Sequence, residues 1–200
     1  MTTFNRCNWI TSNINFTINS NISNSIGMYN TAVGYDAGNS IEGSNNTAVG
    51  AKANASNTGS NNTSIGFQAL VSAPNATNEI TLGNGAITKL RCQVTSITAL
   101  SDARDKKDIR PLPFGLDFIS LLKPVAFTWN TRDKAKVGIK SSGFIAQDLK
   151  AAQEAAGAAE TLNLVYESNP DKLEATPGNL IPVLVKAVQE QQQQIELLKK

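Results

Sequence analysis

The sequence predicts two structures joined in one chain: a repetitive, all-β homotrimeric stalk over residues 1–100, and an α+β domain over residues 101–200 that ends in a coiled-coil helix. Three observations predict this division. Residues 1–100 hold only four of the 18 basic and three of the 16 acidic residues, but 18 asparagines. The first half also repeats with a fixed period. The C-terminus carries the 3-4 spacing of apolar residues that is typical of a coiled coil.

A sixteen-residue repeat occupies about residues 23–85. Gly34, Gly50 and Gly66 lie sixteen residues apart, and each follows a short run, Thr-Ala-Val or Thr-Ser-Ile. A fixed short period predicts a solenoid whose units pack on their neighbours. Within each unit we expect a short strand in that run, and turns in the Gly-Ser-Asn-Asn clusters, which favour left-handed and side-chain-bonded conformations.

Weaker copies flank these repeats. Residues 25–27 and 80–83 resemble degenerate units, as the ends of a repeat array usually do. The alternation of Ile14, Phe16 and Ile18 predicts a further extended strand upstream.

The repeats contain little apolar material. Large apolar residues are too few in each unit for a core in a thin single chain, so we expect each unit to borrow apolar surface from other copies in a homotrimer. The repeats resemble the head repeats of trimeric autotransporter adhesins, which also occur in viral fibres. The alternative is a disordered Asn/Ser-rich linker, which has no reason to keep glycines in register.

The second half shows the patterns of a compact α+β domain. Helical spacing of apolar residues ends before Pro124, because proline disfavours the helical conformation of the residue before it. Runs rich in β-branched and aromatic residues follow, and then an alanine-rich segment. The predicted elements are a helix over 116–122, strands over 125–129 and 137–140, a helix over about 146–159 that ends near Gly157, and a short strand over 165–166.

The C-terminal residues 179–200 predict a coiled-coil helix. A segment of only about two and a half heptads is marginal unless chains associate. The alternative is one amphipathic helix that packs on its own domain. The spacing of 3, 4, 3, 4, 3 falls on Ile181, Leu184, Val188, Gln191, Ile195 and Leu198.

Composition excludes several functions. The chain has no histidine, which rules out a histidine-based triad and a zinc site with histidine ligands, and we expect no cofactor. Cys7 and Cys92 are too few for a disulfide framework. A net charge of +2 without a basic cluster predicts no nucleic-acid partner, and no run of apolar residues is long enough to predict membrane insertion. Residues 1–10 make a poor signal peptide.

A serine and a lysine lie close in sequence where the composition changes. A serine hydroxyl needs a nearby base, and without histidine a lysine can serve, so Ser101 and Lys106 form a candidate pair. On an α-helix, five residues span roughly 500°, which places the two on different faces. A turn, or a lysine of another subunit, would have to bring them together. Alternatively, Ser101 or Asp102 merely caps a helix that begins at Ala103, with Asp105 in its first turn.

Five blocks in residues 101–200 together resemble the intramolecular chaperone auto-processing domain, first known from phage endosialidase tailspikes. This resemblance implies a C-terminal trimeric chaperone that cuts itself off. It implies that Ser101 is the nucleophile, that Lys106 is the base and that the scissile bond joins Leu100 to Ser101. The blocks are Ser-Asp-x-Arg-x-Lys at 101–106, Leu-Lys-Pro-Val at 122–125, Phe-Thr-Trp at 127–129, Gly-Phe-Ile-Ala-Gln-Asp-Leu at 143–149 and Val-Lys-Ala-Val-Gln-Glu at 185–190.

The charged neighbours of Lys106 are expected to have opposite effects on the protonation of its amine. Arg104 and Lys107 are cations that would favour a neutral lysine base. Asp105 stands where the family often has an apolar residue, and a carboxylate beside Lys106 would favour its charged form and slow cleavage.

The expected function is therefore that of a chaperone for a viral fibre or tailspike, assembled in the host cytoplasm and located in the virion. Its partners are two further copies of the chain and, as client, its own stalk over residues 1–100; no receptor is identified. The alternative is a structural trimerisation and attachment module without proteolysis. A membrane-tethered transcription factor is disfavoured, because residues 1–100 contain no basic DNA-binding element.

Overall fold

The computed structural model describes residues 14–16, 27–94 and 96–199. The chain divides into two compact units, Met1–Thr88 and Lys89–Lys200. The boundary that the charge distribution predicts, between residues 100 and 101, falls inside the second unit. Within the described ranges, no helix is long and apolar enough to cross a membrane.

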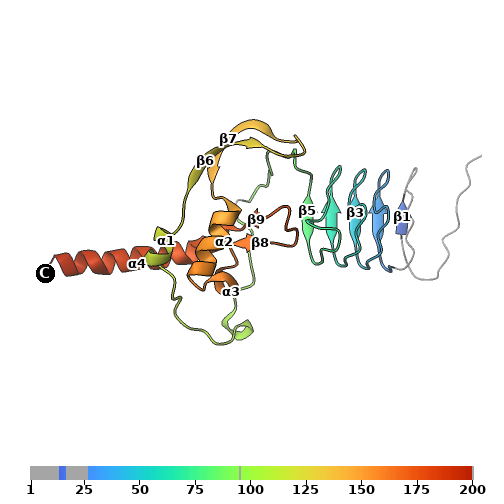
Figure 1. The fold of residues 1–200 in the computed structure, drawn as a ribbon. Coiled ribbons are helices and arrows are strands. Elements are labelled where there is room, and N and C mark those ends of the chain that lie inside the picture. The colour runs from blue at the N-terminus through green and yellow to red at the C-terminus, as the bar shows by residue number, and fades with distance from the viewer. Residues whose placement is uncertain (1–13, 17–26, 95, 200) are drawn as a thin grey trace, which may run out of the picture. The chain divides into compact units, whose positions relative to one another are not determined.

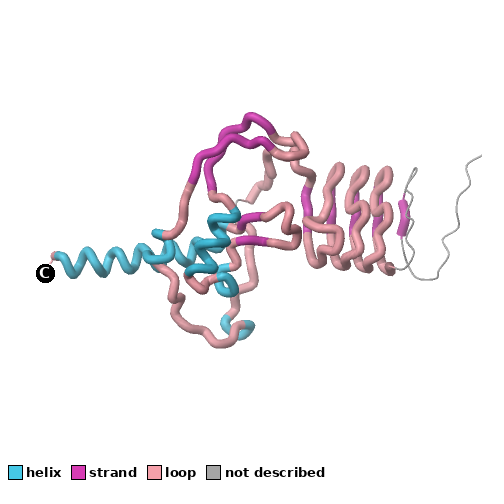
Figure 2. Tube along the Cα trace, in the orientation of Figure 1, coloured by secondary structure: helices cyan, strands magenta, loops and turns pink. Residues whose placement is uncertain are grey.

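The first unit is a solenoid with one short strand in each turn of the chain (Figures 1 and 2). Neighbouring strands pair in parallel, with Thr31 opposite Thr47 and Thr47 opposite Thr63, so equivalent positions of successive repeats lie side by side. The strands are, in chain order and in sheet order, β1 (Ile14–Phe16), β2 (Thr31–Val33), β3 (Thr47–Val49), β4 (Thr63–Ile65) and β5 (Ile80–Leu82).

These strands confirm the one predicted in each of the three repeats and show that the degenerate copy at 80–83 adds another. Of the upstream alternation, Ile14–Phe16 forms β1, whereas Ile18 lies outside the described residues, as do Cys7 and residues 1–10. The copy at 25–27 is described only at Gly27. The homotrimeric arrangement stays a prediction.

Asparagines form a ladder inside the solenoid. The side-chain oxygen of Asn30 accepts the backbone N–H of Asn46 at 2.8 Å, and that of Asn46 accepts the backbone N–H of Asn62 at 3.0 Å. The amide nitrogens of Asn30 and Asn46 donate to the carbonyl oxygens of Gly43 and Gly59 at 2.8 and 3.0 Å. All three asparagines are buried, and the ladder supplies the partners that buried polar groups need.

Small residues complete this interior. Ala32, Ala37, Ala48 and Ala53 are fully buried and pack together. The expectation that each unit lacks a core of its own therefore needs correction. The interior is narrow, and alanines, hydrogen-bonded asparagines and the fully buried side chain of Ile41 fill it.

Close stacking explains why glycines recur in the solenoid. A Cβ atom added to Gly43 would lie 1.8 Å from the carbonyl oxygen of Gly59, one repeat further on. Gly50 also has a φ of 123° and leaves only 2.6 Å between such a Cβ atom and the Gly66 carbonyl oxygen. Left-handed conformations of this kind favour glycine. The glycine period is thus a requirement of backbone contact between units.

We therefore expect Gly43→Ala to destabilise the solenoid by about 1–3 kcal/mol, because the added methyl group forces successive repeats apart. The measurement is the midpoint of urea unfolding. Gly178→Ala is the matched control: its Cβ atom would meet no other atom within 4 Å. An unchanged midpoint for Gly43→Ala would contradict the stacked register.

The second unit combines a hairpin with several short helices and one longer C-terminal helix (Figure 1). Its strands β6 and β7 are antiparallel, with Val125 opposite Gly143. The elements are η1 (Ala103–Asp105), α1 (Leu116–Ser120), β6 (Val125–Asn130), β7 (Val137–Gly143), α2 (Ala146–Ala155), α3 (Ala159–Leu162), β8 (Val165–Tyr166), β9 (Glu174–Ala175), η2 (Pro177–Leu180) and α4 (Ile181–Leu198).

The predicted helices and strands of this half are present, with one correction. The helix predicted over 146–159 is two helices, because α2 ends at Ala155 and α3 begins at Ala159. Gly157 lies between them with a φ of 62°, a left-handed conformation that ends helices. The end of the helix near Gly157 is thus confirmed, while Ala159 belongs to a separate helix.

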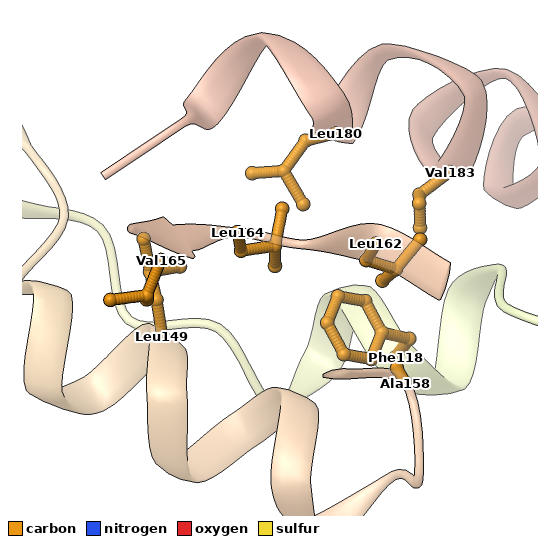
Figure 3. Close-up of a cluster of buried hydrophobic side chains, with 8 residues drawn as sticks. All are labelled: Phe118, Leu149, Ala158, Leu162, Leu164, Val165, Leu180 and Val183. Carbon is orange, nitrogen blue, oxygen red and sulfur yellow. The ribbon is translucent and has the colours of Figure 1, made fainter. Parts of the chain in front are cut away.

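One apolar core joins helices α1, α2, α3 and α4 and strand β8 of this unit (Figure 3). Phe118 comes from α1, Leu149 from α2, Val165 from β8 and Val183 from α4, and all are buried. The core thus gathers segments that are separate in the sequence. It gives the second unit a hydrophobic centre of its own.

Helix α4 is fixed against α1 by a polar contact as well. The Glu190 carboxylate accepts the backbone N–H of Leu116 at 2.7 Å and lies 3.4 Å from the Lys186 ammonium. The hydrogen bond from Leu116, followed by that from Lys186, holds the pKa of Glu190 below its ordinary value. A Cβ atom at Gly115 would lie 2.3 Å from this carboxylate, so glycine permits the close approach.

Candidate active site

The candidate site begins with a single helical turn. The 3₁₀ helix η1 covers Ala103–Asp105, and Asp102 is its N-cap: its side-chain oxygen accepts the backbone N–H of Arg104 at 2.9 Å. Short polar side chains commonly cap helices in this way. The expected cap is therefore present, and Asp102 supplies it. The Ser101 hydroxyl takes no part in this cap and makes a different contact.

Lys106 makes that contact. Its Nζ atom lies 2.7 Å from Ser101 Oγ and 3.2 Å from the Ser101 carbonyl oxygen. Lys106 has an extended conformation, with φ −122° and ψ 146°, immediately after the turn. On an α-helix, a spacing of five residues would place the two side chains on different faces. Here a single 3₁₀ turn lies between Ser101 and Lys106 and brings their side chains together within one chain.

Asp102 and Arg104 form an ion pair beside these two residues. Arg104 Nη2 lies 2.6 Å from Asp102 Oδ2, and Arg104 Nε lies 3.1 and 3.2 Å from the two carboxylate oxygens. The guanidinium, and then the Arg104 backbone N–H, lower the pKa of Asp102, while the carboxylate raises the pKa of Arg104. The charge of Arg104 is balanced by Asp102, so Arg104 is not the free cationic neighbour of Lys106 that the sequence suggested.

Asp105, the acidic neighbour of Lys106, makes no close ion pair with it. No ion pair within residues 96–199 joins Asp105 to Lys106; the Lys106 amine is directed at Ser101 instead.

The residues on both sides of the Leu100–Ser101 peptide bond are exposed. Leu100 is 86% exposed, and Ser101 and Lys106 are exposed as well. The site therefore brings together a hydroxyl, an amine and a peptide bond between two exposed residues, one of which carries the hydroxyl. This set suits acyl transfer to the serine followed by attack of water.

Sequence reasoning missed one part of the site, the pairing of Asp102 with Arg104. The available signal was the Asp-x-Arg spacing directly after the serine. That reasoning treated Asp102 as an alternative to catalysis, whereas the structure shows that capping by Asp102 and the Ser101–Lys106 contact coexist.

Residues 101–158 match the family model described as chaperone of endosialidase, and the second unit therefore contains an endosialidase-type chaperone domain. The match begins at Ser101. Neither a curated protein nor a solved structure matches the chain.

Proposed function

We propose that this chain is part of a virion fibre or tailspike, whose second unit directs folding and homotrimerisation of the solenoid and then releases itself by cleavage between Leu100 and Ser101. The observation that carries the proposal is the 2.7 Å contact between Lys106 Nζ and Ser101 Oγ. Because the residues of this contact are exposed and belong to one chain, the reaction needs no second substrate other than water.

The chemistry proceeds by transfer of an acyl group. Lys106, as a neutral amine, accepts the hydroxyl proton of Ser101, and Oγ attacks the carbonyl carbon of Leu100. The bond from that carbon to the Ser101 nitrogen breaks, and the nitrogen takes up a proton to become a free amine. Water then hydrolyses the ester, which leaves a carboxylate on Leu100 and restores the Ser101 hydroxyl. Each chain reacts once.

Apolar side chains on the outside of the solenoid support the homotrimer. The third position of each strand stacks on the next, so Val33, Val49, Ile65 and Leu82 form one row. Val33, Ile65 and Leu82 are 39%, 44% and 51% exposed, although they are large aliphatic residues. An apolar row of this kind on a protein surface marks an interaction site. Other copies of the same solenoid would cover it.

Helix α4 gives independent support for association. It packs on its own unit through Val183 and Ala187, which are buried, whereas Ile181 and Val188 are 64% and 63% exposed. The latter belong to the predicted coiled-coil seam. Because the helix buries a different face in its own core, its seam remains available to other copies.

The chaperone role is supported by the slow strand pairing that the solenoid requires. Its strands pair only with partners sixteen or more residues away, and pairings of this kind form slowly. A unit that holds three chains in register during this slow step accelerates assembly. Its removal afterwards leaves the stalk without the element that would guide unfolding and refolding, so the stalk is kinetically trapped.

Two measurements, on the wild-type protein and on the Ser101→Ala variant, test this function. Freshly made protein is expected to give two fragments of similar length on denaturing electrophoresis, and the uncleaved Ser101→Ala protein is expected to sediment as three chains. A stable monomer at micromolar concentration would contradict both the stalk and the chaperone. A wild-type trimer that never cleaves would favour the non-proteolytic attachment module instead.

A further inference from the structure

The turn that carries Lys106 back to Ser101 has little support from packing. None of its residues, Ala103–Asp105, is buried. A three-residue helical turn is unstable by itself, because its nucleation fixes several backbone angles for one hydrogen bond. Its backbone contacts are weak as well: the N–H groups of Asp105 and Lys106 donate to the carbonyls of Asp102 and Ala103, each at 3.2 Å.

The Asp102 carboxylate supplies the shorter contacts that hold the turn. One oxygen, Oδ1, accepts the Arg104 backbone N–H at 2.9 Å, and the other, Oδ2, accepts from Arg104 Nη2 at 2.6 Å. The guanidinium thus keeps the carboxylate oriented while it caps the turn. Hydrogen bonds between charged groups are stronger than neutral ones, and a fork of this kind fixes geometry.

We propose that Asp102 is a positioning residue for self-cleavage: its cap, braced by Arg104, holds the turn in which Lys106 reaches the Ser101 hydroxyl. This inference rests on the proposed Ser101–Lys106 cleavage and deepens it. Asp102 touches neither reacting atom in this account and acts only through the conformation of residues 102–106. Asp102, which directly follows the nucleophile, thus has a role in cleavage without taking part in the chemistry.

The two contacts of Asp102 differ in expected importance. Capping contributes more than an exposed ion pair, which is screened by solvent and contributes little by itself. Asparagine caps helices about as well as aspartate. Asp102→Asn is therefore expected to keep the turn, while Asp102→Ala removes both the cap and the brace. Arg104→Ala should have an intermediate effect.

The first test is the rate constant of self-cleavage in the full chain. We expect Asp102→Ala to slow cleavage about tenfold, and Asp102→Asn to cleave within about threefold of the wild-type rate. Arg110→Ala, which removes an exposed arginine just outside the motif, is the control for Arg104→Ala. The positioning role would be overturned if Asp102→Ala cleaved at the wild-type rate, or if Asp102→Ala and Asp102→Asn slowed cleavage equally.

A second measurement reads the geometry without cleavage. In the Ser101→Ala full chain, with methyl-labelled alanine, an NMR cross-relaxation contact is expected between the new methyl group and the Lys106 side chain. Adding Asp102→Ala should remove this contact, and adding Asp102→Asn should preserve it. If Asp102→Ala leaves the contact unchanged, the inference is overturned even when wild-type protein cleaves. If wild-type protein does not cleave but the contact responds as expected, the proposed function fails and the positioning by Asp102 stands.

Discussion

Replacing Ser101 by alanine is expected to abolish self-cleavage, a loss of more than about a thousandfold in rate, because the substitution removes the nucleophile. Lys106→Ala should have a comparable effect, since Lys106 is the amine that lies 2.7 Å from the serine hydroxyl. Denaturing electrophoresis of freshly made protein over a time course measures both. Cleavage that persists in Ser101→Ala would refute the mechanism.

Lys107→Ala is the matched control for Lys106→Ala. Both lysines are exposed and adjacent, but only the amine of Lys106 is placed on Ser101. Lys107→Ala should therefore cleave at nearly the wild-type rate. Neither change should unfold the domain, because substitutions of exposed side chains usually alter stability by less than about 0.5 kcal/mol. Equal loss in the two variants would show that the register of the motif is misread.

Residues 1–100 made without the second half are expected to aggregate or to remain unfolded. Without a trimerising unit, the apolar row that includes Val33, Ile65 and Leu82 stays exposed during the slow pairing of parallel strands, and exposed rows of this kind promote aggregation. The soluble fraction and the far-ultraviolet circular dichroism of this half measure the effect. The full chain with Ser101→Ala, produced in parallel, is the control and should be soluble. Soluble, trimeric, β-rich protein from residues 1–100 alone would refute the chaperone role.

The repeat could be predicted because it reflects direct stacking. The glycines at 34, 50 and 66 recur where the backbones of successive units touch, so their spacing fixes the length of one solenoid turn. The interior could not be predicted in the same way. Asn30 and Asn46 look like loop residues in the sequence. Only the parallel register shows that the Asn30 side chain accepts the backbone N–H of Asn46 and that the Asn46 side chain donates to the Gly59 carbonyl.

The C-terminal helix illustrates a second limit. The 3-4 spacing identifies a seam that includes Ile181 and Val188, but it does not reveal that Val183 and Ala187 form another buried face. Two apolar faces on one helix overlap in the sequence pattern. Which face contacts the helix's own core is decided by tertiary packing around Phe118 and Leu164.

The candidate site was predictable in its residues and not in its geometry. A serine and a lysine without histidine indicate a pair, but their distance depends on whether the intervening residues form an α-helix or a single 3₁₀ turn. Asp102 decides this locally through its cap. Its ion pair with Arg104 also changes the charge around Lys106, which a reading of neighbouring residues in the sequence does not reveal.

The most direct test of self-cleavage is the N-terminus of the released fragment. Mass spectrometry of freshly made wild-type protein should find one fragment that ends at Leu100 with a free carboxylate and one that begins at Ser101 with a free amine. This result requires the bond before the serine to break and the ester to be hydrolysed. An intact chain, or a new N-terminus at any other residue, would contradict the account.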